Sequence, residues 1–328
     1  KPLPAVLTAP DGRPILSQSE SQFKTTKFGL YTNDGAQREV FSVQMSRLFN
    51  DGEGAFSIGY THQNIDMICS MQSSTSHSNY GKCPASDFQY RSASRSIYET
   101  EHRLFATLSS THYFFGPESP TTFNLFFERK SGLPGTLSFD TYSSPGRYQT
   151  QAFGHERRTN DDSAQLLYIP SGVSDPLVCW VSCTNPNLAV ANEILDLLYN
   201  TYGLKSYAGG IVAPGAFEFP YQTTLDLKIT QVLPGFRDDD EFVISLAIEN
   251  LLNLIDDNEG EIFYGDYTGK IQVLDFQLTP DLSKYIYGNS RGADYAFRYN
   301  PNDPYDLSKS AVNSIWRAQL GFTYRFSL

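Results

Sequence analysis

The sequence predicts an all-β protein, an antiparallel transmembrane β-barrel with long extracellular loops. Apolar and polar residues alternate in several segments, most strictly over about ten residues at the C-terminus, the length of a tilted membrane strand. Short turns alternate with long polar connections along the chain. Mean hydropathy is modest (-0.36) although 14% of the residues are aromatic, and no run of about 18 apolar residues forms a transmembrane helix. Barrel strands give such averages because their two faces differ.

The final segment is the clearest predicted strand. From Trp316 onward, apolar residues alternate with Gln, Gly, Thr, Arg and Ser over about ten residues. The last strand closes an outer-membrane barrel, so this segment is where the barrel-assembly machinery is expected to act. The predicted barrel-assembly residues are Leu320, Phe322, Tyr324, Phe326 and Leu328.

The same alternation predicts about ten strands in this chain. Their expected ranges are 25–31, 39–49, 55–63, 101–115, 121–130, 221–233, 241–250, 270–278, 284–288 and 315–328. The last two strands before the terminal one form a predicted hairpin, with Thr279-Pro280-Asp281 in its turn.

The predicted connections are of two kinds. Short turns are expected at 50–54, 116–120 and 234–240, and long polar segments at 62–99, 130–220 and 250–269. Outer-membrane barrels have short periplasmic turns and long extracellular loops, whereas compact soluble domains seldom carry such long connections. The final strand is therefore expected to end on the periplasmic side.

Helical spacing within the longest connection predicts a short helix. Ala191, Ile194, Leu195 and Leu198 recur at intervals of three and four residues. We interpret this helix as the cap of an extracellular loop, with a ligand-binding helix as the alternative.

Four cysteines predict two local disulfides. Cys69 and Cys83 lie in one polar stretch, and Cys179 and Cys183 lie in another. No CxxC pair and no histidine at zinc spacing accompanies them, so a structural zinc site is not expected. An oxidising compartment such as the outer surface of a diderm bacterium favours disulfides, and four unpaired thiols are the alternative.

Catalytic motifs are missing from the sequence. It has no nucleophile elbow, HExxH, Walker or dinucleotide-binding motif, so we expect neither an enzyme nor a cofactor. The formal charge of -11 argues against nucleic acid as a partner.

Glu101-His102 suggests a metal or acid–base pair, but no third residue to complete it is visible in the sequence. The expectation is a solvated rim residue.

Two acidic stretches are candidate calcium sites, because calcium takes several carboxylates. Asp238 to Glu241 occupies a predicted periplasmic turn and is interpreted as a solvated charge run. The better calcium candidates lie in a predicted extracellular loop and are Asp256, Asp257, Glu259 and Glu261.

Six motifs in order from about residue 30 to the C-terminus resemble one family, the Oar-like TonB-dependent receptors. They are Thr32 to Gly35, Tyr98 to Arg103, Phe127 to Pro134, Leu166 to Gly172 preceded by Asp161-Asp162, Thr224 to Gln231, and Ile248 to Asn253. The last two resemble barrel motifs shared most widely across TonB-dependent receptors.

The resemblance implies a barrel of about 22 strands around a plug, in the outer membrane of a Gram-negative bacterium. Residues 1–328 would be the C-terminal part of that barrel, and the plug, the first strands and the signal peptide would lie upstream of Lys1. The residues that follow Lys1 show no signal peptide pattern. The implied partners are outer-membrane lipid, the inner-membrane TonB complex acting through the N-terminal part, and an unidentified substrate. Members of the family are also linked to protein export and adhesion.

Two other functions remain open from the sequence. A passive outer-membrane barrel or surface adhesin would need no energy coupling. A secreted β-sandwich that binds carbohydrate would pack its apolar strand faces against each other rather than against lipid.

Overall fold

A computed structural model of the chain describes residues 5–8, 11–16, 34–69, 74, 79, 83–87, 90–140, 166–180, 185–237, 239–263, 270–278, 295–298 and 309–326. Within this part the protein is mostly antiparallel β-sheet with few helices, as the sequence predicts. No helix among these residues is long and apolar enough to cross a membrane.

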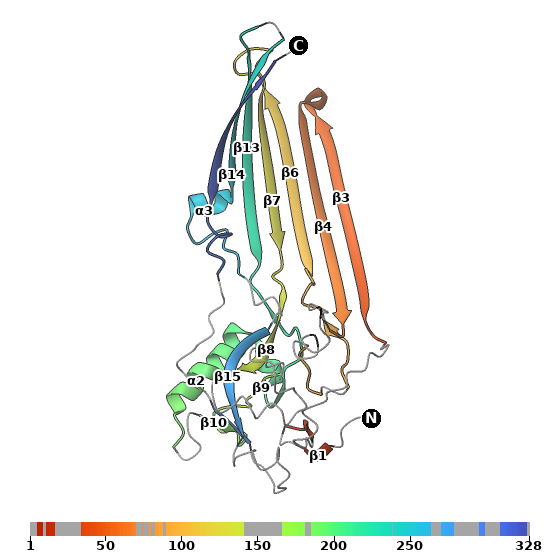
Figure 1. Cartoon of the computed structure of the whole chain (residues 1–328), viewed down its shortest axis with the longest axis vertical. Helices are drawn as coiled ribbons and strands as arrows, with labels where there is room; N and C mark the ends of the chain where they lie inside the picture. Colours follow the sequence, from red (N-terminus) through yellow and green to blue (C-terminus); the bar gives the residue numbers. More distant parts are fainter. Residues whose placement is uncertain are drawn as a thin grey trace.

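One large antiparallel sheet dominates the structure (Figure 1). Its long strands are ordered β17-β14-β13-β7-β6-β4-β3, and the two-residue strand β5 (Ser94–Arg95) pairs with the end of β4. In chain order the long strands are β3 (Gln37–Phe49), β4 (Gly54–Met67), β6 (His102–His112), β7 (Thr121–Lys130), β13 (Gln222–Pro234), β14 (Glu241–Glu249) and β17 (Arg317–Arg325).

The short turns all lie at one end of this sheet, and the C-terminus lies there too (Figure 1). The β3–β4 turn is a single 3-10 turn at Asn50–Gly52, in which Asn50 and Asp51 take left-handed φ angles of 50° and 53°. Short side chains that hydrogen-bond locally favour this conformation. The long connections leave from the opposite end, in agreement with the predicted asymmetry.

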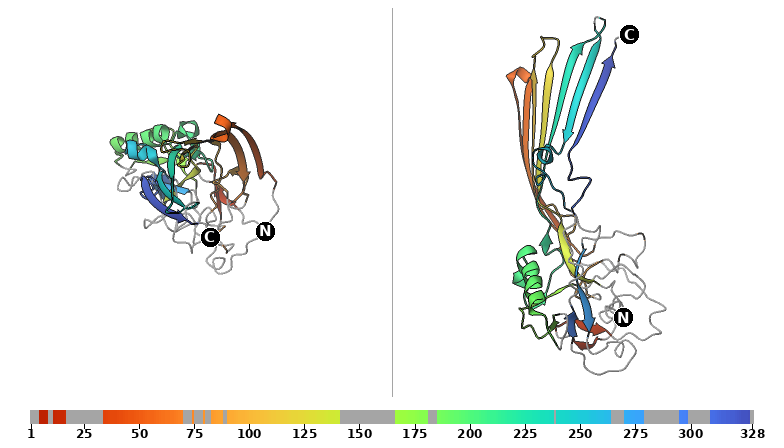
Figure 2. Two further views of the ribbon diagram at one scale, coloured as in Figure 1. Left: turned by 90° about the horizontal axis from the view of Figure 1, so that it is seen from above. Right: turned by 90° about the vertical axis from the view of Figure 1, so that its left-hand side faces the viewer.

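The sheet is curved and open. Figure 2 shows it from above as an arc. Among the described residues no strand pairs with the outer edge of β3 or of β17.

Beyond the other end of the strands lies a compact body that we call the loop lobe (Figure 1). It holds the N-terminal pair β1 (Ala5–Thr8) and β2 (Pro14–Leu16) and the sheet β10-β16-β15-β8-β12. In chain order after β2, the elements of the lobe are β8 (Pro134–Asp140), β9 (Tyr168–Ile169), β10 (Val178–Cys179), α2 (Leu188–Asp196), a π-helical turn η5 (Leu197–Thr201), η6 (Leu204–Tyr207), β11 (Gly210–Ile211), β12 (Phe217–Glu218), β15 (Lys270–Leu278) and β16 (Tyr295–Arg298).

The hydrophobic core of the described structure lies in this lobe. Its buried members are Leu137, Leu166, Leu167, Tyr168, Ile169, Trp180, Ala191, Ile194, Leu198, Tyr202, Leu204, Val212, Phe217 and Phe219. The predicted helix is present as α2 with η5. Asn187 caps it by accepting hydrogen bonds from the backbone N–H groups of Ala189 and Val190. The apolar spacing thus reflects packing in a core.

Two sequence expectations need correction. The strand at 270–278 exists as β15, but it pairs in parallel with β8 and antiparallel with β16, outside the large sheet. The connection at 130–220 is not an irregular polar loop, because much of it folds into the lobe core. Alternation identifies a half-buried strand but not the sheet that it joins. The expected strands 25–31 and 284–288 lie outside the described residues.

Candidate functional site

The large sheet has one mostly apolar face that spans all seven long strands. Residues directly opposite each other in an antiparallel pair lie on the same face, so the strand register assigns each side chain. The apolar face comprises Phe41, Val43, Met45, Phe56, Ile58, Tyr60, Leu104, Ala106, Leu108, Phe123, Leu125, Phe127, Leu225, Leu227, Ile229, Leu233, Phe242, Ile244, Leu246, Ile248, Ala318, Leu320, Phe322 and Tyr324.

Large side chains of the apolar face are uncovered. Phe41 is 61% exposed, Leu320 is 60% exposed and Phe322 is 62% exposed, although all belong to regular strands. A contiguous exposed apolar surface of this size marks contact with lipid or with another protein. Along β13 the face extends from Leu225 to Leu233, about 26 Å at about 3.3 Å per residue.

The opposite face of the sheet, the polar face, carries hydroxyl, amide and charged side chains that bond across strands. Ser42 bonds Thr61 at 3.1 Å, and the Gln44 amide donates to Ser57 at 2.9 Å. Glu128 accepts from Arg103 at 2.7 Å and contacts Lys130 at 3.0 Å. By register, the polar side chains of this face include Ser42, Gln44, Ser46, Ser57, Thr61, Arg103, Thr107, Ser109, Asn124, Glu128, Thr224, Asp226, Lys228, Ser245, Gln319 and Thr323.

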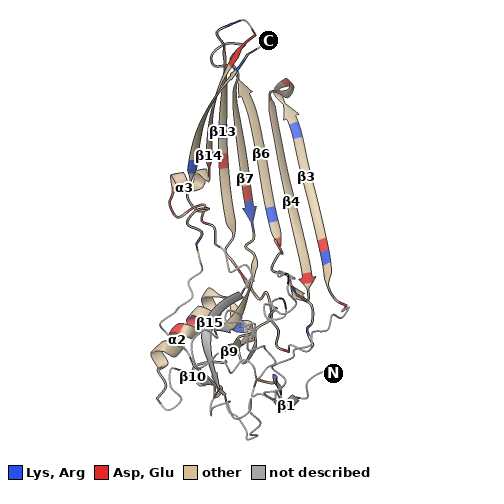
Figure 3. Ribbon diagram, viewed as in Figure 1, with Lys and Arg blue, Asp and Glu red and all other residues tan. Residues whose placement is uncertain are grey.

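Charges avoid the middle of the apolar face. Figure 3 shows most Lys, Arg, Asp and Glu of the long strands near the strand ends. The two mid-strand exceptions on β13, Asp226 and Lys228, both belong to the polar face by register. Gln231 interrupts the apolar face near the short turns, where its amide donates to the carbonyl of Ser119 at 3.1 Å. Apart from Gln231 and residues near the strand ends, such as Arg47 opposite Phe56, this face is apolar.

The terminal strand β17 is anchored to the neighbouring short turn. The Tyr324 hydroxyl donates to the buried carboxylate of Asp240 at 2.6 Å and accepts from the backbone N–H of Phe236 at 3.1 Å. Arg325 pairs with Glu241 at 3.1 Å. Leu320, Phe322, Tyr324 and Phe326 are all exposed, as the alternation predicts, and Leu328 lies outside the described residues.

This anchor revises the interpretation of the acidic stretch at 238–241. The sequence suggested a solvated charge run, but Asp240 is 6% exposed and holds the terminal strand. Asp238 lies outside the described residues. The signal was Tyr324, one residue before the end of β17, whose hydroxyl reaches the turn because β14 and β17 are neighbours.

Two asparagines stabilise the connection between the end of β14 and the start of β17. Asn250, in a left-handed conformation, donates through its side chain to the carbonyls of Gly260 at 2.9 Å and Ser314 at 3.1 Å. Asn253 accepts from the backbone N–H of Trp316 at 3.2 Å. Asn250 directly precedes the short helix α3 (Leu251–Ile255), and Asn253 lies within it. The Ile248 to Asn253 motif is thus a structural corner.

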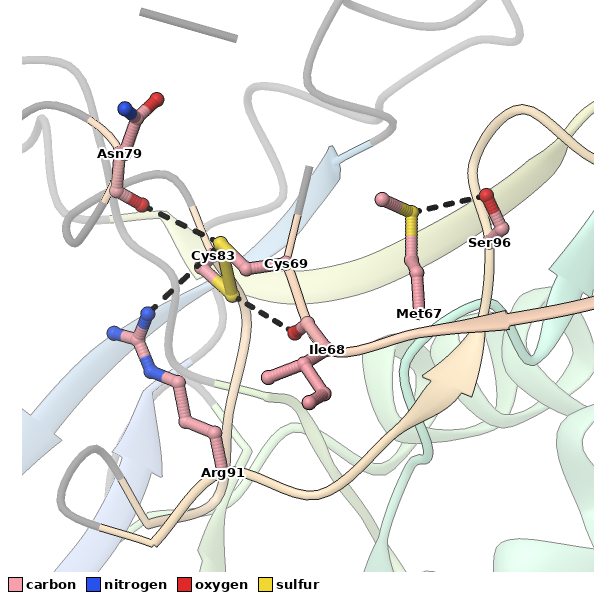
Figure 4. The surroundings of a disulfide bond; sticks show 7 residues. All are labelled: Met67, Ile68, Cys69, Asn79, Cys83, Arg91 and Ser96. Carbon is pink, nitrogen blue, oxygen red and sulfur yellow. Dashed lines mark hydrogen bonds between the residues drawn. A yellow bond between two sulfur atoms is a disulfide. The ribbon is translucent and has the colours of Figure 1, made fainter. Parts of the chain in front are cut away.

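The predicted disulfide between Cys69 and Cys83 is present (Figure 4). The two Cα atoms are 5.4 Å apart and the residues are separated by 14 positions. Cys69 follows the end of β4, so the bond closes the start of the β4–β6 connection. Such a loop closure contributes about 3 kcal/mol by restricting the unfolded chain. The Cys179 side chain and Cys183 lie outside the described residues.

Arg95 joins the β4–β6 connection to the loop lobe. Its guanidinium pairs with Glu99 at 2.5 Å, Glu101 at 2.7 Å and Glu218 of β12 at 2.8 Å. Burial by itself would lower the pKa of Arg95, but the hydrogen bonds to Glu218 and Glu99 outweigh it and raise the pKa. Three carboxylates surround this one guanidinium, so the cluster has an excess of acidic groups.

Next to Arg95 and its carboxylates lies a group of three possible metal ligands, of which the sequence pointed to Glu101 and His102 but not to His62. His62 of β4 and His102 of β6 face each other in register, and Glu101 precedes His102. One ligand atom from each lies within 4.8 Å of the others. In the part of the chain that is described, no other group of three such residues meets this test. No local signal pairs the two histidines, because a long connection joins β4 to β6 and no short turn sets their register.

The four calcium candidates do not converge in the described structure. Asp256 accepts hydrogen bonds from the backbone and side-chain N–H groups of Asn258, which lower the pKa of its carboxyl group. Glu261 is paired with Lys309. Asp257 and Glu259 are exposed, and their backbone carbonyls accept from Asn253. These residues therefore serve the corner between β14 and β17.

Comparisons with protein-family models, with curated proteins and with solved structures found no match.

Proposed function

We propose that this chain is the C-terminal part of the β-barrel of an Oar-like TonB-dependent receptor, which moves an unidentified substrate across the outer membrane. One observation carries the proposal, namely that a mostly apolar face spans all seven long strands, opposite a hydrogen-bonded polar face. Transmembrane barrels alternate in this way, with apolar residues toward lipid and polar residues toward the interior.

The position of the loop lobe favours lipid over protein as the cover of the apolar face. In a β-sandwich a second sheet packs face to face, about 10 Å away. Here the lobe lies beyond the strand ends and has a core of its own (Figures 1 and 2). At the tilt of about 40° that is usual in such barrels, the apolar extent of about 26 Å along β13 covers about 20 Å of their apolar band, which is about 25 Å tall.

The proposed orientation follows from the connections. Short turns face the periplasm in outer-membrane barrels, so β17 would end there and the loop lobe would lie outside the cell. The open edges of β3 and β17 would pair with strands of the remaining barrel, about 22 strands in all by the family resemblance. Closure would remove both exposed edges.

The proposed roles of the parts follow from this placement. The polar face would line the interior around a plug, and the loop lobe would meet the substrate first. The outward residues of β17 would be the surface that the barrel-assembly machinery receives. Passage would be driven by the inner-membrane TonB complex through the N-terminal part of the receptor.

The function is tested on native full-length protein from the source bacterium. Detergent, but not high salt, should release it from outer membranes, and it should bind the purified periplasmic domain of TonB. Membrane retention without TonB binding would instead support the passive barrel or surface adhesin. Release by high salt alone would contradict the membrane assignment and favour the secreted carbohydrate-binding sandwich.

A further inference from the structure

His62, Glu101 and His102 lie together where the sheet meets the β4–β6 connection. They are half-buried, so a small ion can reach them and a fourth ligand can be water. The rings of the two histidines are stacked with centroids 5.0 Å apart. The Nε2 atom of His102 is 3.4 Å from the Oε1 atom of Glu101. Ligand atoms around a tetrahedral zinc ion are about 3.3 Å apart, given metal–ligand bonds of about 2.0 Å.

Both imidazole rings are oriented by a hydrogen bond at Nδ1. His62 Nδ1 donates to the backbone carbonyl of Glu101 at 3.1 Å. Because a carbonyl only accepts, neutral His62 then keeps a lone pair at Nε2. His102 Nδ1 bonds the Tyr60 hydroxyl at 2.8 Å, and this hydroxyl can turn to accept and free Nε2 in the same way. Such partners commonly fix ligating histidines in metal sites.

The surrounding charge also favours a cation. Glu101 Oε2 is held by Arg95, which leaves Oε1 toward His102. Arg95 is shared with Glu99 and Glu218, so one positive group faces three carboxylates. A divalent ion at Glu101 would offset this excess negative charge.

We propose that His62, Glu101 and His102 bind a divalent transition-metal ion, with Zn²⁺ as the best fit. Two imidazoles and one carboxylate are a zinc ligand set with an open fourth position, whereas Ca²⁺ and Mg²⁺ prefer oxygen ligands alone. The ion would clamp β4 to β6 at the base of their long connection. This inference goes beyond the proposed transport function and does not depend on it.

The test is zinc titration calorimetry on the full-length protein, in detergent, after chelator treatment and removal of any affinity tag. We expect one site that weakens at least about 10-fold in His62→Ala and in His102→Ala. Tyr60→Phe should weaken it about 10-fold, as loss of an orienting partner does. The matched control is His112→Ala, at the other end of β6, where the ring contacts Ser110. It should bind as the wild type does.

A second readout keeps the test independent of variant folding. Co²⁺ added to wild-type protein should give the intense visible absorption of a four-coordinate site, and Zn²⁺ should remove it. The proposal is overturned if the wild type shows no saturable site, or if the His62 and His102 variants bind as tightly as the wild type. An equal loss in His112→Ala would overturn it as well.

Discussion

Leu125→Arg is expected to weaken folding of the full-length protein into bilayers by about 2–4 kcal/mol, the cost of an arginine near the membrane midplane. Leu125 is central on the apolar face, with Leu108 and Leu227 opposite it on the two neighbouring strands. On β7 it also has Phe123 and Phe127 on the same face. Urea titration of protein reconstituted in lipid vesicles measures the difference, and immunoblots of outer-membrane fractions should show less protein.

The matched control is Phe126→Arg, one residue further along the same strand. Phe126 belongs to the polar face and has Asp226 directly opposite, so an arginine there gains an ion-pair partner. We expect a change of less than about 1 kcal/mol, within the range of exposed pairs. Equal losses in the two variants would contradict the assignment of the faces.

Leu198→Ala is expected to destabilise the loop lobe by about 3 kcal/mol. Leu198 is fully buried in the lobe core, and removing such a side chain leaves a cavity as well as losing apolar burial. Because the lobe core is separate from the large sheet, the effect should be local. Amide hydrogen exchange should accelerate in the lobe while β6 and β7 keep their protection.

Leu188→Ala is the control for this variant. Leu188 starts the same helical segment but is 55% exposed, so its truncation should change stability by about 0.5 kcal/mol or less. Faster exchange throughout the large sheet in Leu198→Ala would mean that sheet and lobe fold as one unit, against the two-part description.

The large sheet was predictable because its pattern is local. Phe322 and Tyr324 alternate with Gly321 and Thr323, and a strand with one apolar face needs no distant information to be recognised. The turn at Asn50–Gly52 was equally readable, since few residues tolerate left-handed φ angles. The neighbours of each strand followed where turns were short.

The loop lobe and the histidine group depend on distant pairings that local patterns do not encode. Strand β15 alternates like a barrel strand, yet β8, more than a hundred residues earlier, is its partner. His62 and His102 meet only because β4 pairs with β6 across a long connection. Tyr324 and Asp240 meet in the same indirect way. Alternation determines the faces of a strand but not its neighbours.

The most direct test of the central claim, that the apolar face contacts lipid, is spin-label accessibility along β17. Single labels at residues 319–323 would be read in reconstituted full-length protein in which Cys179 and Cys183 are serine. We predict that collisions with oxygen, which concentrates in lipid, peak at Leu320 and Phe322 and fall at Gln319, Gly321 and Thr323. Uniform values, or peaks at the polar positions, would contradict the account.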